Sequence, residues 1–220
     1  VLALGGCATP TTSFLGGTYP RLSYYDLRKR EVPLRLKLSV EFQRNGQHFP
    51  KGDVPLRDYA NQILRDSGVI TPVEEGEEGE IRVVLNNVAD PQTVAAERES
   101  TMHPLWMVGT TITDAYELSM FITMKGKTIA RMGIKNAVHT ALGNIRIPDT
   151  IQTFPHNQAF GKLLEQMMLR ALVDMQRTRE LATLASIAPP AMEHGLRQGA
   201  VRTFRSFSRK PTQPLPPSGL

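Results

Sequence analysis

The chain has 220 residues, of which 40% are hydrophobic, and a formal net charge of +5 at pH 7. A chain of this length predicts one domain with flanking tails, and its hydrophobic content is sufficient for one core. No apolar run reaches the roughly eighteen residues of a membrane-spanning helix. The lone cysteine excludes an internal disulfide and any metal site made of several cysteines.

That cysteine, Cys7, follows a short apolar run and two glycines. A signal peptidase accepts small residues behind an apolar run, so we expect residues 1–6 to be the end of a signal peptide. Leu4-Gly5-Gly6-Cys7 resembles the lipobox of bacterial lipoproteins. The resemblance implies that Cys7 takes a diacylglyceryl group, becomes the first residue after cleavage and is acylated on its new amine. Ala8, which is not aspartate, then implies the outer membrane, on its periplasmic face. The alternative is an ordinary buried free cysteine.

Residues 7–33 contain threonine, glycine and proline and show no sustained period. We expect a lipidated tether that docks in part on the domain through Tyr19, Tyr24 and Tyr25. Each buried CH2 of an acyl chain contributes about 0.8 kcal/mol, so three chains on Cys7 would hold the protein on a membrane essentially permanently.

The domain is expected at 34–178 and starts with a strand. Apolar and polar residues alternate over 34–42, which is typical of a half-buried strand, and Asn45-Gly46 predicts a tight turn. Asp53 as N-cap, an apolar stripe and Gly68 predict a helix over 54–67.

An acidic loop follows this helix, with glutamates at 74, 75, 77, 78 and 80. Their spacing does not match a calcium loop, so we favour a solvated loop. Alternation then predicts strands over 81–85, 116–124 and 130–138, the last two joined by an antiparallel turn.

The connection over 90–113 contains Leu105, Trp106, Met107 and Val108. A long loop inside a domain is uncommon unless it is functional. This apolar cluster is a candidate contact with a partner or a membrane, and the alternative is that it folds back over one end of the core.

The strongest helical pattern runs over 160–175, with Asn157 as its cap and helical character to about 185. Its methionines are expected to fill the core, with a groove for a partner helix as the alternative. Residues 179–220 predict a flexible, basic, proline-rich tail. From His194 onward the tail has five cationic residues and no carboxylate, so it can contact anionic surfaces or simply be solvated.

Together these elements predict an α+β fold of two layers: about four mostly antiparallel strands with two helices on one face, in the order β-α-β-β-β-α. The other face is expected to be wet or to contact a partner, and an edge strand can recruit a partner by strand addition. This face carries the alternate polar residues of the strands, namely Arg35, Lys37, Glu41, Arg82, Glu117 and Lys135.

The element order and the lipobox resemble small periplasmic lipoproteins of proteobacteria, among them auxiliary lipoproteins of envelope transport systems and the lipopolysaccharide-assembly lipoprotein. The resemblance implies a non-catalytic assembly or accessory component of an envelope complex, whose partner is another envelope protein. The alternative is lipid or lipopolysaccharide binding in transport between membranes.

The sequence contains little that indicates catalysis or metal binding. The five histidines have no metal-ligand spacing, and H-E-x-x-H, G-x-S-x-G, G-x-G-x-x-G and P-loop motifs are missing. We therefore expect no enzymatic activity, no cofactor and no metal. Export to the periplasm also argues against a nucleic-acid partner.

Overall fold

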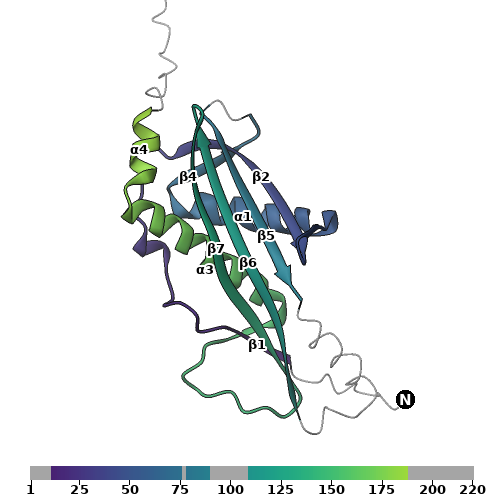
Figure 1. Cartoon of the computed structure of the whole chain (residues 1–220). Helices are drawn as coiled ribbons and strands as arrows, with labels where there is room; N and C mark the ends of the chain where they lie inside the picture. Colours follow the sequence, from purple (N-terminus) through teal and green to yellow (C-terminus); the bar gives the residue numbers. More distant parts are fainter. Residues whose placement is uncertain (1–10, 76–77, 90–108, 188–220) are drawn as a thin grey trace, which may run out of the picture. The chain divides into compact units, whose positions relative to one another are not determined.

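A computed structural model describes residues 11–75, 78–89 and 109–187 (Figure 1). These residues belong to one compact unit with an α+β fold. Helices α1 (Asp53–Ser67) and α3 (His156–Arg177) lie on one face of a mixed sheet, and α4 (Glu180–Ile187) follows α3 and contacts it. The α+β class therefore agrees with the sequence prediction in its coarse form.

Within the described ranges the sheet has eight strands, of which seven form a continuous order and β4 (Ile70–Val73) pairs with β2. β2 runs parallel to both β4 and β5, and the other pairs are antiparallel. The continuous order is β3 (Gln47–His48), β2 (Leu34–Arg44), β5 (Glu80–Val88), β6 (Thr110–Met124), β7 (Lys127–Leu142), β1 (Thr11–Leu15) and β8 (Thr153–Pro155).

The prediction of about four strands and two helices was wrong in number. The four predicted strands are the long strands β2, β5, β6 and β7, whereas the short strands β1, β3, β4 and β8 were missed. β1 lies within the stretch expected to be a tether. Helical structure does not continue through Thr178, because Arg179 adopts a positive φ of 60° and α4 begins as a separate helix.

The helix ends agree with the sequence in one case and differ in two. Gly68 ends α1 with a φ of 65°, and its amide donates to the carbonyl of Arg65, as predicted. Asp53 is not the N-cap of α1, because Gly52 precedes the helix and the Asp53 carboxylate binds elsewhere. α3 begins at His156, so Asn157 is not its cap.

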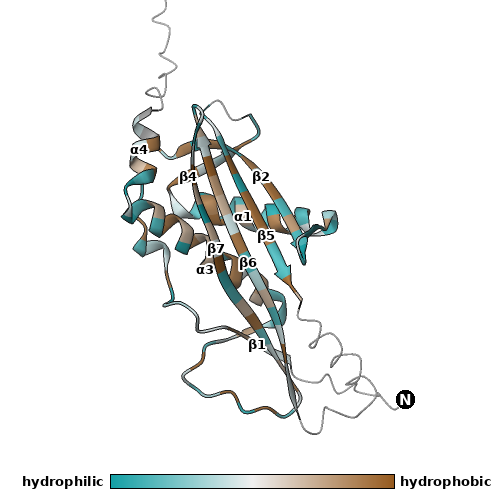
Figure 2. Cartoon of the chain, viewed as in Figure 1, coloured by the Kyte–Doolittle hydropathy of each residue, from teal (hydrophilic) through white to brown (hydrophobic). Residues whose placement is uncertain are grey.

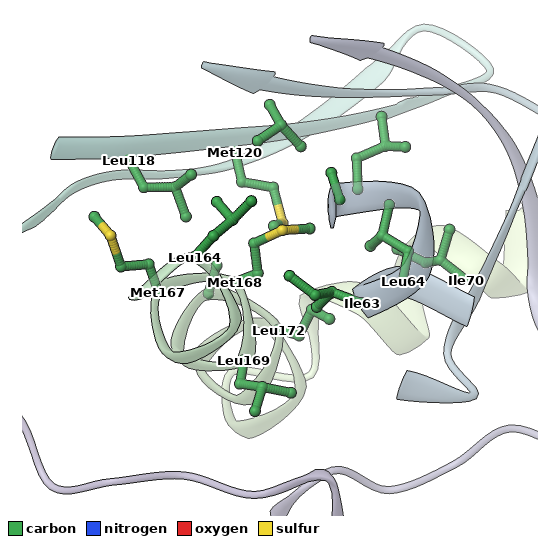
Figure 3. Close-up of a cluster of buried hydrophobic side chains, with 14 of the residues drawn as sticks. Ile63, Leu64, Ile70, Leu118, Met120, Leu164, Met167, Met168, Leu169 and Leu172 are labelled. Carbon is green, nitrogen blue, oxygen red and sulfur yellow. The ribbon is translucent and has the colours of Figure 1, made fainter. Parts of the chain in front are cut away.

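The core lies between the sheet and the two long helices. Figure 3 shows Leu118 and Met120 of β6 pointing toward Leu164 and Met168 of α3, and all four side chains are fully buried. The methionines of α3 are buried, as predicted: Met167, Met168 and Met175. Hydrophobic and hydrophilic residues alternate along β2 in Figure 2. Along β5, buried residues alternate with more exposed ones. Both patterns arise because only one face of each strand meets the helices.

Between β1 and β2 the chain crosses α3 as a strap, residues 16–33, which contains one short 3-10 helix, η1 (Tyr24–Asp26). Gln166 accepts from the amide of Leu22 and donates to its carbonyl, both at 2.8 Å. Gln176 accepts from the amide of Arg28 at 2.9 Å and donates to its carbonyl at 2.7 Å. Two glutamines of one helix thus hold the backbone of the strap by paired hydrogen bonds.

The tyrosines expected to dock this stretch contribute unequally. Tyr24 packs against the core, Arg170 lies over the ring of Tyr19 at 5.1 Å, and Tyr25 is fully solvent-exposed.

Candidate functional site

The site residues predicted from the sequence, Cys7 and Leu105, Trp106, Met107 and Val108, lie outside the described residues. The described residues hold three surfaces with chemical character: a charged sheet face, an open stretch of one sheet edge, and a basic cluster beside α3.

The charged face is the side of the sheet opposite the helices. All six residues predicted for it alternate with the inward-facing residues of their strands, as expected. Arg82 pairs with Glu41 at 2.5 Å between β5 and β2, and Lys135 pairs with Glu117 at 3.9 Å between β7 and β6. Exposed ion pairs of this kind contribute only about 0–1 kcal/mol to the stability of the fold. Stabilisation of the fold therefore explains little of why these charged residues occur on this face.

Glu41 is held ionised on this face. The side-chain amide of Gln43 donates to its carboxylate at 2.6 Å, and Arg82 donates to the other oxygen. These hydrogen bonds, that from Gln43 first, lower the pKa of Glu41. The carboxylate therefore presents a negative charge that is held in place by Gln43 and Arg82.

The second surface is an open stretch of the β2 edge. β4 pairs with Leu34–Lys37 and β3 pairs with Gln43–Arg44, on the edge away from β5. Between them, Leu38–Glu41 pairs with β5 on one edge but has no neighbouring strand on the other edge among the described residues, and a groove of about 1000 Å³ lies beside it. We call this gap the edge notch. It is lined by Arg35, Lys37, Leu38, Ser39, Val40, Arg57, Asn61, Arg65, Pro72, Val73, Glu74, Glu75 and Glu78.

The third surface, the basic cluster, brings together the strap and the end of α3. Five cations line a groove of about 880 Å³ here, together with two carboxylates, Asp26 and Glu31. The hydrogen bonds between Gln176 and the Arg28 backbone fix the strap beside the helix. The cations are Arg28, Lys29, Arg30, Arg177 and Arg179.

Sequence reading missed the basic cluster. The run Arg28-Lys29-Arg30 is a visible signal, but its partners on α3 lie about 150 positions later in the chain.

The histidines among the described residues have structural partners. His139, on β7, stacks on Phe14 at 5.1 Å and shares a 2.9 Å hydrogen bond with Thr113. Burial lowers its pKa. His48 lies 2.8 Å from the Asp53 carboxylate, which also accepts from the amide of Phe42.

His156 lies 3.3 Å from the hydroxyl of Ser13, which is fully buried and also bonds Thr140 at 3.0 Å. A nucleophile must reach its substrate, so this buried serine is a poor candidate for covalent catalysis. The part of the chain that the structure describes holds no cluster of three or more metal-ligating acidic, histidine or cysteine side chains.

No model of a known protein family matches the sequence, and no curated protein matches it significantly. Among the described residues, no helix is both long and apolar enough to span a membrane.

Proposed function

We propose that this protein is a lipoprotein of the outer membrane, anchored on the periplasmic face through acyl chains on Cys7. In this role it acts as a non-catalytic assembly or accessory component of an envelope complex and binds another envelope protein. The lipobox-like sequence ending at Cys7 supports the anchor. The charged sheet face supports the binding role.

The observation that carries the binding role is the fixed, mixed charge across four neighbouring strands. Complementary charges give a protein interface specificity and register more than raw affinity. The pairs Arg82–Glu41 and Lys135–Glu117 each join two neighbouring strands on this face, and Arg35 and Lys37 are exposed on the same face. A partner with the opposite pattern of charge would find a pre-arranged surface.

The anchor is tested by Cys7→Ala. We expect the wild-type protein in the membrane fraction, with a mass increased by its acyl groups, and the variant in the soluble fraction at its unmodified mass. Cys7→Ser, which also lacks the thiol, should behave like Cys7→Ala. Wild-type protein that is soluble and carries a free thiol would refute the anchor.

The binding role is tested by affinity purification from a gentle detergent extract after crosslinking. We expect wild-type protein to retain a defined envelope protein, and Arg35→Glu/Arg82→Glu to lose it. Lys51→Glu/Lys127→Glu, which changes the same number of exposed cations elsewhere, should retain it. Crosslinks from residues 100–113 would show whether Leu105, Trp106, Met107 and Val108 contact the same partner.

The basic cluster favours a second function, lipid or lipopolysaccharide binding in transport between membranes. Five cations with two carboxylates give this groove a net positive charge that suits phosphate headgroups. Vesicles of phosphatidylglycerol should then bind Cys7→Ala protein at low salt, whereas vesicles of phosphatidylcholine should not. Arg28→Gln/Lys29→Gln/Arg177→Gln should remove this binding, and an unchanged Trp106 emission with both vesicles would argue against this function.

A further inference from the structure

We infer that the edge notch of β2 binds an extended acidic peptide segment of a partner protein by strand addition. This inference rests on the proposed function as a protein-binding component, for which it supplies the binding mode and the chemistry of the partner. Four observations lead to it: unpaired backbone groups, incomplete burial, a narrow concave shape and cations on both sides.

The hydrogen bonds that flank the notch show which way the backbone of β2 points. The amide of Leu34 donates to the carbonyl of Val69, on the β4 side. Further along the same edge, the carbonyl of Phe42 accepts from the amide of Phe49. Backbone groups along a strand alternate between its two edges, so the N–H and C=O of Val40 also point to this edge.

The pairing of β2 with β4 ends at Lys37, which lies opposite Val73. In a parallel pair, the amide of the next residue, Leu38, then makes the last hydrogen bond between these two strands. This leaves the carbonyl of Leu38 and both backbone groups of Val40 without a partner strand among the described residues. One donor and two acceptors are therefore available to an incoming strand.

The neighbouring edge of β4 is blocked, in contrast. Pro72 has no N–H, and its carbonyl accepts a 3.2 Å hydrogen bond from Arg65. Proline at a sheet edge is a common protection against unwanted strand pairing. The notch in β2 has no such protection among the described residues, which makes it the more available edge.

Burial along β2 points to the same place. Leu34 and Leu36 are 3% and 0% exposed on the helix side, whereas Leu38 and Val40 on the same side are only partly buried. A strand placed beside Val40 would complete the cover of these two side chains. Burying apolar area contributes about 25 cal/mol per Å², so this adds to the hydrogen bonds.

The shape of the notch selects the kind of occupant. β3 and β4 flank it on the same edge, so the open stretch is concave and short. In a second copy the same edge carries the same two flanking strands, which prevent two copies of β2 from meeting at their notches. A single extended peptide is narrow enough to enter.

The charges that line the notch determine which peptides it favours. Side chains of a strand alternate between the two faces of the sheet. Lys37 and Arg35 line the notch on the charged face, and Arg57 and Arg65 line it on the helix side. An acidic peptide therefore meets cations with side chains on either face, as in other sites that pair carboxylates with arginine.

Three carboxylates, Glu74, Glu75 and Glu78, also line the notch against its four cations, which leaves a net charge of +1. The carboxylate of Glu78 already accepts a hydrogen bond from the amide of Arg35 at 3.0 Å. The protein's own basic tail has five cations and no carboxylate from His194 onward, so its charge does not suit the notch.

The test uses the Cys7→Ala chain and three short blocked peptides labelled with a fluorophore. The first alternates valine and aspartate, the second has lysine in place of aspartate, and the third is the aspartate peptide N-methylated at alternate amides. We expect the first to bind and to slow hydrogen exchange of the Val40 amide. The other two should bind at least about tenfold more weakly, because each lacks a charge-assisted or backbone hydrogen bond.

Two variants test the notch itself. Lys37→Gln/Arg57→Gln should weaken binding of the aspartate peptide about tenfold, whereas the control Lys51→Gln/Lys127→Gln should not change it. Val40→Pro removes the backbone N–H that faces the notch and places the proline ring there, so this variant should not bind the peptide. An edge position tolerates proline, so the variant should still fold. If Val40→Pro does not fold, the charge variant alone decides.

Equal binding of the aspartate and lysine peptides, no effect of N-methylation, or no binding of any peptide at millimolar concentration would overturn the inference. These outcomes are distinct from failure of the proposed function. A chain that stays on membranes and retains its partner, but whose partner is unaffected by Lys37→Gln/Arg57→Gln and Val40→Pro, keeps its proposed role and loses this binding mode.

Discussion

Gln166 and Leu22 exchange two hydrogen bonds of 2.8 Å, although 144 positions separate them in the chain. The side-chain amide of the glutamine matches the donor and acceptor of the Leu22 backbone, as a neighbouring strand would. Gln176 repeats this arrangement with Arg28 ten residues further along α3. Two glutamines of the helix therefore hold the strap, and the position of the basic cluster depends on the second of them.

Gln166→Ala and Gln176→Ala should each lower the free energy of unfolding by about 2 kcal/mol, because each removes two hydrogen bonds worth about 1 kcal/mol apiece. Urea unfolding measures this, and hydrogen exchange at the amides of Leu22 and Arg28 should accelerate in the matching variant only. Gln62→Ala, an exposed glutamine of α1, is the control and should have little effect. Unchanged exchange at Leu22 in Gln166→Ala would mean that other contacts hold the strap.

The Asp53 carboxylate is expected to make stability depend on pH in acid. Burial favours its neutral form, but the amide of Phe42 and the side chain of His48 outweigh burial and lower the pKa of Asp53. A lowered folded-state pKa stabilises the fold above the unfolded pKa of about 3.9, and this contribution is lost as the pH falls through the folded value.

Asp53→Asn should therefore be less stable than wild type near pH 7, and the difference should shrink as the pH falls below about 4. Unfolding by urea at a series of pH values measures both quantities. Asp58→Asn changes an exposed carboxylate of the same helix and should leave the pH profile unchanged. A constant difference between Asp53→Asn and wild type across this range would refute the assignment.

The long strands could be predicted because β2, β5, β6 and β7 each alternate apolar and polar residues over many positions. The short strands carry no such pattern. β1 has the polar residue Ser13 buried in its centre, and β4 contains Pro72. Their pairing depends on tertiary neighbours, which local alternation does not contain. The parallel pairing of β2 with β5 is also a property of the connection, not of either strand.

The charged face could be predicted from the same alternation, because the residues between the buried residues of a strand must lie on the opposite face of the sheet. The edge notch could not, since it depends on where β4 ends, opposite Lys37, and on where β3 ends, opposite Gln43. The contacts of Gln166 and Gln176 with the strap were not predicted either. A side chain that bonds a distant backbone has no signature in one sequence.

Tyr116 should make stability fall in alkali. Burial, with a smaller contribution from Asp114, raises the pKa of Tyr116 to about 12. The neutral phenol stabilises the fold below the unfolded pKa of about 10, and this contribution is lost as the pH rises from about 10 to 12. Tyr116→Phe keeps the ring against Phe160 and should lose less stability over this range. Tyr25→Phe, at a fully exposed tyrosine, should follow the wild-type curve.

Gly161 sets how closely α1 and α3 approach. A Cβ at this position would lie 2.6 Å from a ring carbon of Tyr59, whereas glycine in an unconstrained helix is about 1 kcal/mol worse than alanine. Gly161→Ala should therefore destabilise the protein by about 1–3 kcal/mol, the usual cost of overpacking, instead of stabilising it. In a Tyr59→Ala background the same change should be neutral or stabilising, because the ring is gone. A double-mutant cycle by urea unfolding measures this coupling, and equal effects in both backgrounds would show that the two helices move apart freely to accept the methyl group.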